Sequence, residues 1–196
     1  SQTHLGVSAI MEAIPLLASL KALARRLEEE ADPASPFLPR HATLTVGLLN
    51  GGTAGNILAR ECSFQFDLRC PPGQDPRAVI APFIDEVHGL DRRLKAQFPE
   101  AGAKIVQRSN TPPLAPERDG AAEAFARRLA GDNGPARVVP YAAEAGQFQE
   151  AGFSTVICGP GSIDQAHQAN EYVDQVQMER GAAFMARLIE WAAVGE

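Results

Sequence analysis

The sequence predicts a mixed α/β protein. Its first half reads as an α+β unit of the ferredoxin-like type without its first strand, and its second half reads as an α/β layer. Helical spacing of apolar residues recurs over about residues 6–31 and 76–98. Strand patterns occupy residues 42–49 and 61–70, and a shorter one follows near 103–108. The order helix, strand, strand, helix, strand is that of a βαββαβ unit that lacks its first strand.

The first helix is expected from about residue 6 to 31, although Pro15 lies within it and a proline inside a helix costs about 3 kcal/mol. The segment 61–70 alternates cleanly between apolar and polar residues. We therefore expect one face of this strand to pack on a core and the other face, which carries Asp67 and Arg69, to be exposed to solvent. The chain opens on Ser1 and the absent strand is central in this topology, so we expect a piece of a longer chain.

The second helix begins with Asp75 as N-cap and Pro76 as its first residue. A proline-rich stretch at 109–116 reads as a linker and divides the chain into domains 1–108 and 109–196. The second domain alternates helices and strands, which predicts an α/β layer. Its expected helices are 119–130 and 178–193, the latter burying Ala182, Met185, Leu188 and Ile189, and its expected strands are 137–140 and 154–158.

Composition excludes several classes of protein. The net charge of −6 comes from mixed charges, which argues against nucleic acid as a partner. No apolar run is long enough to span a membrane. The three cysteines contain no CxxC spacing, so neither a disulfide framework nor a structural zinc site is expected. We expect a cytoplasmic protein whose cysteines are small core residues.

Residues 159–173, which follow the apolar run 154–158, form the strongest candidate for a ligand-binding loop. The loop begins Gly-Pro-Gly-Ser and carries His167 among polar residues. Ligands of α/β folds bind at the carboxyl ends of strands, glycine lets the backbone approach a ligand, and histidine is the commonest metal ligand. The alternative is a surface loop with a solvated histidine.

Five motifs occur in the order and spacing of a known family. They are residues 5–10 (LGVSAI), 51–56 (GGTAGN), 67–73 (DLRCPPG), 143–145 (AEA) and 159–172 (GPGSIDQAHQANEY). In this series the chain resembles the M20 metallopeptidases, and within them the acetylornithine deacetylase branch. The resemblance spans nearly all 196 residues.

The resemblance implies a metal-dependent amidohydrolase with two zinc ions, sometimes cobalt, that acts on an N-acyl amino acid in arginine biosynthesis. Residues 1–108 then correspond to a dimerisation lid that forms a homodimer. Residues 109–196 correspond to the end of the catalytic domain. The general base and most metal ligands lie in the family's N-terminal half, so we expect no catalytic residue in this chain and no activity from it alone.

The resemblance also assigns roles to individual residues. His167 matches a metal ligand, and Arg69 matches a lid arginine that engages the substrate carboxylate. Asn56 matches an asparagine that reaches a neighbouring subunit's site. Gly159, Gly161 and Ser162 match a loop that presents N–H groups to the carboxylate.

Structural alternatives stand beside these roles. Arg69 could simply pair with Asp67, Asn56 could be a turn residue, and the glycines could form only a tight turn.

Glu144 matches the acid of the branch's Thr-Glu-Ala motif, which faces the amine end of the substrate. Ala143 replaces the threonine here, and this departure puts the preference for ornithine in doubt. His4 does not match the family's catalytic lid histidine, which would fall just before Ser1.

The function predicted for the intact protein is hydrolysis of an N-acetyl amino acid. The alternatives within the family are a desuccinylase, an aminoacylase or a carboxypeptidase. Outside it, the chain could be an inactive dimerisation module or an amino-acid-binding domain.

Overall fold

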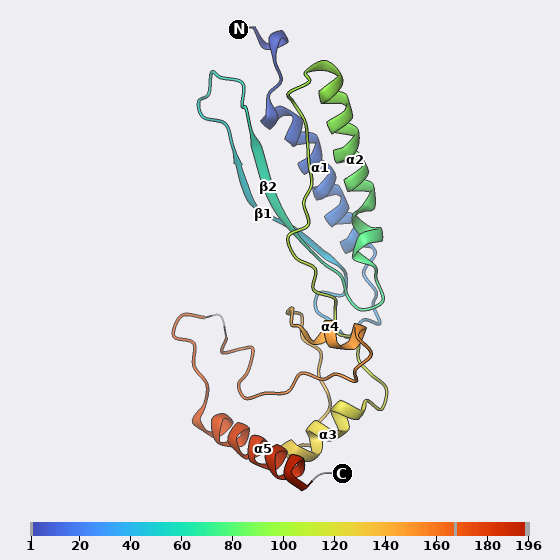
Figure 1. Ribbon diagram of the computed structural model, residues 1–196, viewed down its shortest axis with the longest axis vertical. Helices are drawn as coiled ribbons and strands as arrows, with labels where there is room; N and C mark the ends of the chain where they lie inside the picture. The colour runs from blue at the N-terminus through green and yellow to red at the C-terminus, as the bar shows by residue number, and fades with distance from the viewer. Residues whose placement is uncertain (1, 167, 195–196) are drawn as a thin grey trace. The chain divides into compact units, whose positions relative to one another are not determined.

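A computed structural model describes residues 2–166 and 168–194 of the chain. It has the predicted mixed α/β character, with helices and one antiparallel sheet of strands β1 and β2 (Figure 1). The chain divides into two compact units. Unit 1 comprises residues 1–110 with 138–141, and unit 2 comprises residues 111–137 with 142–196.

Helix α1 of unit 1 follows a short 3-10 turn, η1 (Thr3–Leu5), and spans Ala9–Glu29, close to the range that its apolar spacing predicts. Pro15 lies inside α1 without ending it. The helix buries Ala13, Leu16, Leu20, Leu23 and Leu27 along one stripe. Burial of that stripe on both sides of the proline offsets the lost hydrogen bond, so the helix continues through it.

The sheet of unit 1 is a hairpin of β1 (Thr43–Gly51) and β2 (Cys62–Arg69). In β2 the alternation holds as predicted: apolar residues are partly buried and the intervening polar residues are exposed. A bulge between Val46 and Leu48 shifts the register of β1. Leu48 therefore pairs with Gln65 on the polar face and is exposed, which the sequence pattern does not reveal.

Helix α2 (Pro76–Gln97) closes the core of unit 1. The Asp75 side chain accepts a hydrogen bond of 2.9 Å from the Arg77 N–H, which confirms the predicted N-cap. The Phe83 ring meets the Phe66 ring of β2 edge-on at 5.5 Å between centroids. The main core cluster joins α1 to α2 through Leu16, Leu20, Phe83, Val87, Leu90 and Leu94.

The strand predicted near residues 103–108 does not form. Ala101, Ala103 and Ile105 still pack on the core, and exposure alternates along the segment. Among the described residues, 103–108 make no backbone–backbone hydrogen bond, and the Ala103 N–H donates to the Asp91 side chain at 3.0 Å. The prediction is wrong because a strand requires a hydrogen-bonded neighbour, whereas the pattern of side chains reports only the burial.

Unit 2 contains helices α3 (Ala121–Ala130), α4 (Ala145–Glu150) and α5 (Gln175–Val194). Helix α3 buries Leu129. The strands predicted at 137–140 and 154–158 are absent from this described part of the chain. Helix α5 buries none of its described residues, and Met185 and Ile189 are exposed, contrary to prediction. Helix α5 contacts α3 through the Trp191 and Phe125 rings, but this contact leaves Met185 and Ile189 exposed to solvent.

Cys62 and Cys70 are partly buried, but Cys158 is exposed, so its predicted core position is wrong. Burial raises the pKa of the Cys70 thiol, with a smaller contribution from the Asp75 carboxylate. Over the described residues, no helix combines the length and apolarity needed to cross a membrane.

Candidate functional site

Arg69 lies at the end of β2 on the exposed, polar face of the sheet. Its Nε donates a hydrogen bond of 2.6 Å to Asp67 Oδ2, and both side chains are more than half exposed. The predicted salt bridge is therefore present. Because the guanidinium keeps further N–H donors and both partners face solvent, the pair leaves Arg69 able to bind a carboxylate as well.

Asn56 lies in the connection between β1 and β2 and is exposed. A turn shapes this connection, since the Ile57 N–H donates to the Ala54 carbonyl at 3.3 Å. Gly52 opens it with a positive φ of 73°. Asn56 itself is not among the residues with positive φ, so left-handed backbone is not the reason for asparagine at this position.

The predicted ligand loop of unit 2 lies against α5, since a Cβ at Gly181 of this helix would lie 3.3 Å from Pro160. Gly161 has a φ of 103°, a conformation that favours glycine, and a side chain there would lie 3.7 Å from Val173. The Ser162 hydroxyl accepts a 3.3 Å hydrogen bond from the Asp164 N–H. Gly159 faces open space. The loop is thus a tight turn that is largely exposed to solvent.

His167 lies outside the described residues. Its neighbours are held by short-range contacts: the Gln168 side chain donates to the Asp164 carbonyl at 2.7 Å, and Gln165 Nε2 donates to Asp174 Oδ2 at 3.3 Å. Gln165 Oε1 is buried and has no hydrogen-bond partner among the described groups. Asn170 has a positive φ of 62°, which asparagine tolerates well.

A metal centre is not formed by the part of the chain that the structure describes. No three histidine, cysteine or acidic side chains gather there as a possible ligand set. Zinc needs three or four protein ligands, so the described residues do not fit a zinc ion on their own.

Glu144 precedes α4 as its N-cap residue and is exposed, but its side chain makes no cap hydrogen bond. The Glu144 carboxylate therefore does not cap the helix. Helix α4 is fixed instead by Gly146, which is buried against the proline-rich segment. A Cβ at Gly146 would lie 2.0 Å from the Pro112 carbonyl oxygen, so only glycine fits there.

Sequence reasoning missed the hydrogen-bonded centre of unit 2, Glu117. Its carboxylate accepts from the Ser154 hydroxyl at 2.5 Å, from the Thr155 N–H at 2.9 Å and from Gln149 Nε2 at 3.1 Å. Gln149 also exchanges two hydrogen bonds with the Ala115 backbone. These partners are separated from Glu117 or Ala115 by more than 30 positions in the sequence. No local sequence motif therefore predicts these hydrogen bonds.

The same hydrogen bonds set the charge state of Glu117. Donation by Ser154, then by Thr155 and Gln149, lowers the pKa of the Glu117 carboxyl below its ordinary value. The carboxylate is therefore favoured in its ionised form, which accepts the hydrogen bonds from Ser154, Thr155 and Gln149. Its hydrogen bonds connect residue 117 to α4 and to residues 154–155, which lead to the 159–173 loop.

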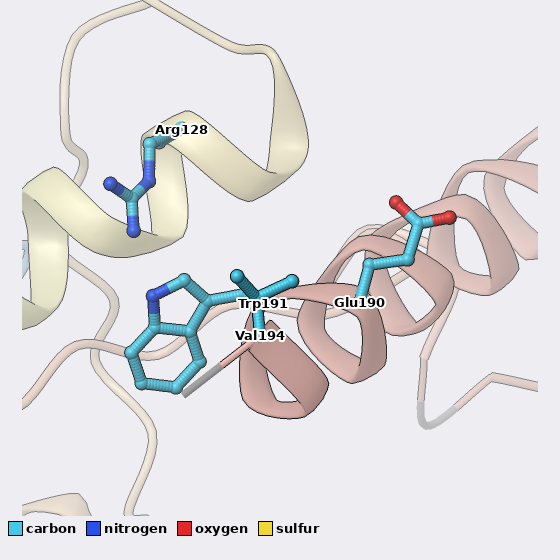
Figure 2. Close-up of a pocket in the computed structure, with 4 residues that line it drawn as sticks. All are labelled: Arg128, Glu190, Trp191 and Val194. Carbon is cyan, nitrogen blue, oxygen red and sulfur yellow. The ribbon is translucent and has the colours of Figure 1, made fainter. Parts of the chain in front are cut away.

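A hollow of about 320 Å³ lies between α3 and α5 (Figure 2). Arg128, Glu190, Trp191 and Val194 line it. The Trp191 ring meets the Phe125 ring edge-on at 4.6 Å, and the Arg128 guanidinium lies 5.2 Å from the centre of the Phe125 ring. None of the predicted site residues lines this hollow, so it forms a separate feature of unit 2.

The predicted site residues divide between the units. Asn56 and Arg69 belong to unit 1, whereas Glu144 and the loop containing Gly159, Gly161 and Ser162 belong to unit 2. All are exposed except Gly161, which is half-buried. Their assigned roles stay predictions.

The chain is similar to known proteins over its first half and over nearly its whole length. Residues 1–93 match a family described as a peptidase dimerisation domain of the M20 type. The chain is 32% identical to an acetylornithine deacetylase of Myxococcus xanthus over 94% of its own length and 47% of the relative. It is 30% identical to an acetylornithine deacetylase of Proteus mirabilis, over 97% of this chain and 47% of that protein.

An N-acetyl-L-citrulline deacetylase of Xanthomonas campestris is 28% identical over 74% of the chain and 38% of its own length. The chain spans about half the length of the first two of these curated relatives.

Proposed function

The chain belongs to the M20 family and is related to its acetylornithine deacetylases, and from this premise we propose that it takes part in hydrolysing the amide bond of an N-acyl amino acid. The acyl group we propose is acetyl. Unit 1 would act as a dimerisation lid that carries Arg69 and Asn56. Unit 2 would supply Glu144, His167 and the 159–162 loop to a site completed by residues outside these 196.

One observation carries this proposal: the similarity to deacetylases extends over nearly the whole chain rather than over the dimerisation domain alone. It therefore includes the 159–172 motif. The exposed Arg69 guanidinium and the open turn at Gly159 both offer N–H donors suited to a carboxylate, which every N-acyl amino acid carries.

Substrate choice is tested with the complete product of the native coding region. Free amino acid release is measured from N-acetylornithine, N-acetylcitrulline and N-succinyl-diaminopimelate, the last as the desuccinylase alternative. We expect the acetylated substrates to be hydrolysed and the succinylated one to be left intact. Absence of amide hydrolysis on all three would reject the proposed function.

Metal dependence is part of the same proposal and rests on the resemblance. The described residues do not form a metal site, so we assign no reaction step to them through a metal. His167 would be one ligand among others supplied from outside this chain. Elemental analysis of the purified 196-residue chain should then show no stoichiometric zinc, while the active protein should lose activity on treatment with a chelator.

The role of Arg69 can be separated from its ion pair. Arg69→Ala should raise KM for the acetylated substrate at least tenfold, with Arg69→Lys in between, because a bidentate contact to the carboxylate is lost. The matched control is Arg26→Ala. Arg26 pairs with Glu30 at 3.8 Å in α1 and is as exposed as Arg69. Equal effects of the two alanine variants on KM would contradict substrate binding by Arg69.

Self-association is a second function that one observation favours, namely the match of residues 1–93 to a dimerisation domain. We propose that the chain forms a homodimer through unit 1. Sedimentation equilibrium of the purified chain should give twice the 20.9 kDa monomer mass. A monomer at tens of micromolar protein would refute the homodimer without bearing on the hydrolase proposal.

A further inference from the structure

The connection between β1 and β2, residues 52–61, is fixed to the beginning of α1 (Figure 1). Ala9 is the first residue of that helix, and its N–H donates a hydrogen bond of 2.8 Å to the Ala59 carbonyl. The first N–H groups of a helix have no acceptor within the helix, and the Ser8 side chain makes no cap hydrogen bond here. The connection therefore provides the acceptor, and this hydrogen bond ties it to the end of the helix.

Ile10, the second residue of α1, lies on the two glycines at the point where β1 ends. A Cβ at Gly51 would be 3.1 Å from Ile10 Cγ1, and a Cβ at Gly52 would be 3.0 Å from Ile10 Cδ1. The Gly51 Cβ would also be 3.1 Å from the Glu61 carbonyl oxygen, and Gly52 has a positive φ of 73°. Both positions therefore favour glycine, and the isoleucine side chain packs directly on the backbone because no side chain stands between them.

The part of the connection that leads into β2 is fixed in a similar way. Ala59 is 5% exposed, and a Cβ at Gly6 would be 3.1 Å from Leu58 Cδ1. The Gly52 N–H also donates to the Glu61 carbonyl at 3.3 Å, which closes the base of the connection. The connection is thus held at both ends by the segment that begins α1.

Asn56 lies between these two anchors, in the exposed part of the connection. A turn forms there, with the Ile57 N–H donating to the Ala54 carbonyl at 3.3 Å. Gly55 faces open space, since a Cβ there would have no atom beyond its chain neighbours within 4 Å. The position of Asn56 relative to α1 is therefore set by the anchors on either side of the turn rather than by packing of the turn itself.

We propose that Ile10 is a positioning residue, which holds the turn of Asn56 in place through Gly51 and Gly52. This inference rests on the proposed function, in which Asn56 belongs to the substrate site. Ile10 itself does not touch the substrate. Without its side chain, the Gly52 end of the connection loses its packing and Asn56 occupies several positions. Fewer molecules then hold Asn56 in the productive geometry, and the rate falls.

The first test measures kcat/KM of the complete product of the native coding region on N-acetylornithine and N-acetylcitrulline. Ile10→Ala should lower kcat/KM at least about tenfold, and Ile10→Val, which removes only the Cδ1 atom, should lower it less. The matched control is Met11→Ala in the next residue of α1. The Met11 side chain is 64% exposed, so this variant should keep the kcat/KM of the unaltered protein.

A double variant separates positioning from a general effect on folding. Asn56→Ala removes the side chain that Ile10 positions, so it should lower kcat/KM by itself. Adding Ile10→Ala to Asn56→Ala should then cause no further loss, because both substitutions act through the same side chain. Losses that multiply would show that Ile10 acts by another route and would overturn the inference.

Amide hydrogen exchange of the same proteins tests the inference without the reaction. Ile10→Ala should speed exchange in residues 52–58 about tenfold or more, because the connection opens more often when one anchor is lost. Exchange in residues 83–94 of α2 should stay unchanged, and Met11→Ala should alter neither segment.

The outcomes distinguish this inference from the proposed function. Unchanged exchange in residues 52–58 of Ile10→Ala would overturn the inference whatever the activity. Hydrolysis that Ile10→Ala leaves unchanged would also overturn it, but the proposed function would stand. Absence of hydrolysis by the unaltered protein would reject the proposed function itself, and positioning for a substrate would fall with it.

Discussion

Leu20 of α1 offers the sharpest test of the packing in unit 1. Its side chain has no exposed area and lies in the cluster formed by α1 and α2. Leu20→Ala removes buried atoms and leaves a cavity, and such changes cost about 2–5 kcal/mol. Two helices and the sheet border the site, which limits its collapse. We therefore expect a loss of about 3 kcal/mol in the free energy of unfolding.

The assay is urea and thermal unfolding followed by far-UV circular dichroism, which α1 and α2 dominate in unit 1. A loss of about 3 kcal/mol corresponds to a fall in Tm of about 12–24 °C for a unit of this size. Trp191 is the only tryptophan of the chain and lies in unit 2. Its fluorescence should report an unchanged midpoint in Leu20→Ala, since the substitution lies in the other unit.

The matched control is Met11→Ala in the same helix. Met11 is 64% exposed, so its truncation should change the free energy of unfolding by less than about 0.5 kcal/mol. The reasoning is refuted if Leu20→Ala costs less than about 1 kcal/mol, or if the two substitutions cost the same.

Three further predictions concern single positions. Gly146→Ala should destabilise unit 2 by about 1–3 kcal/mol, seen as an earlier Trp191 transition in urea, because its Cβ would lie 2.0 Å from a carbonyl oxygen. Gly89→Ala in α2 should stabilise unit 1 by up to about 1 kcal/mol in a urea titration followed by far-UV circular dichroism, since no atom of another side chain lies closer than 4.0 Å to its Cβ. Glu117 has a lowered pKa in the folded chain, so its stabilising effect is present above the ordinary carboxyl pKa and is lost as pH falls through the lowered one. Glu117→Gln should therefore flatten the acid side of the stability profile of unit 2, and an unchanged profile would contradict this role.

The helices of unit 1 could be predicted from the sequence because their signals are local. Apolar residues at helical spacing predicted α1 and α2, and the Asp75-Pro76 pair predicted where α2 begins. The alternation in β2 predicted which side chains face the core, including the exposure of Asp67 and Arg69. Periodicity reports which face is buried, and burial of that face is what holds each element.

The strand near residues 103–108 and the burial of α5 could not be predicted in the same way. Ile105 and Met185 both belong to apolar patterns that are correct as patterns. Whether such a pattern becomes a paired strand or a buried helix depends on a neighbour, and that neighbour is not among the described residues. The bulge in β1 is another non-local feature, since the pairing with β2 moves Leu48 onto the polar face.

The candidate site shows the same division. By its motifs the sequence alone determined which residues deserve testing: Asn56, Arg69, Glu144, His167 and the 159–162 loop. Only the tertiary structure showed that Arg69 donates a hydrogen bond to Asp67 on an exposed surface. It also showed that a Cβ at Gly146 would clash with the Pro112 carbonyl oxygen. Composition and spacing act through neighbours along the chain, whereas steric fit and hydrogen-bond partners are decided by residues that folding brings together.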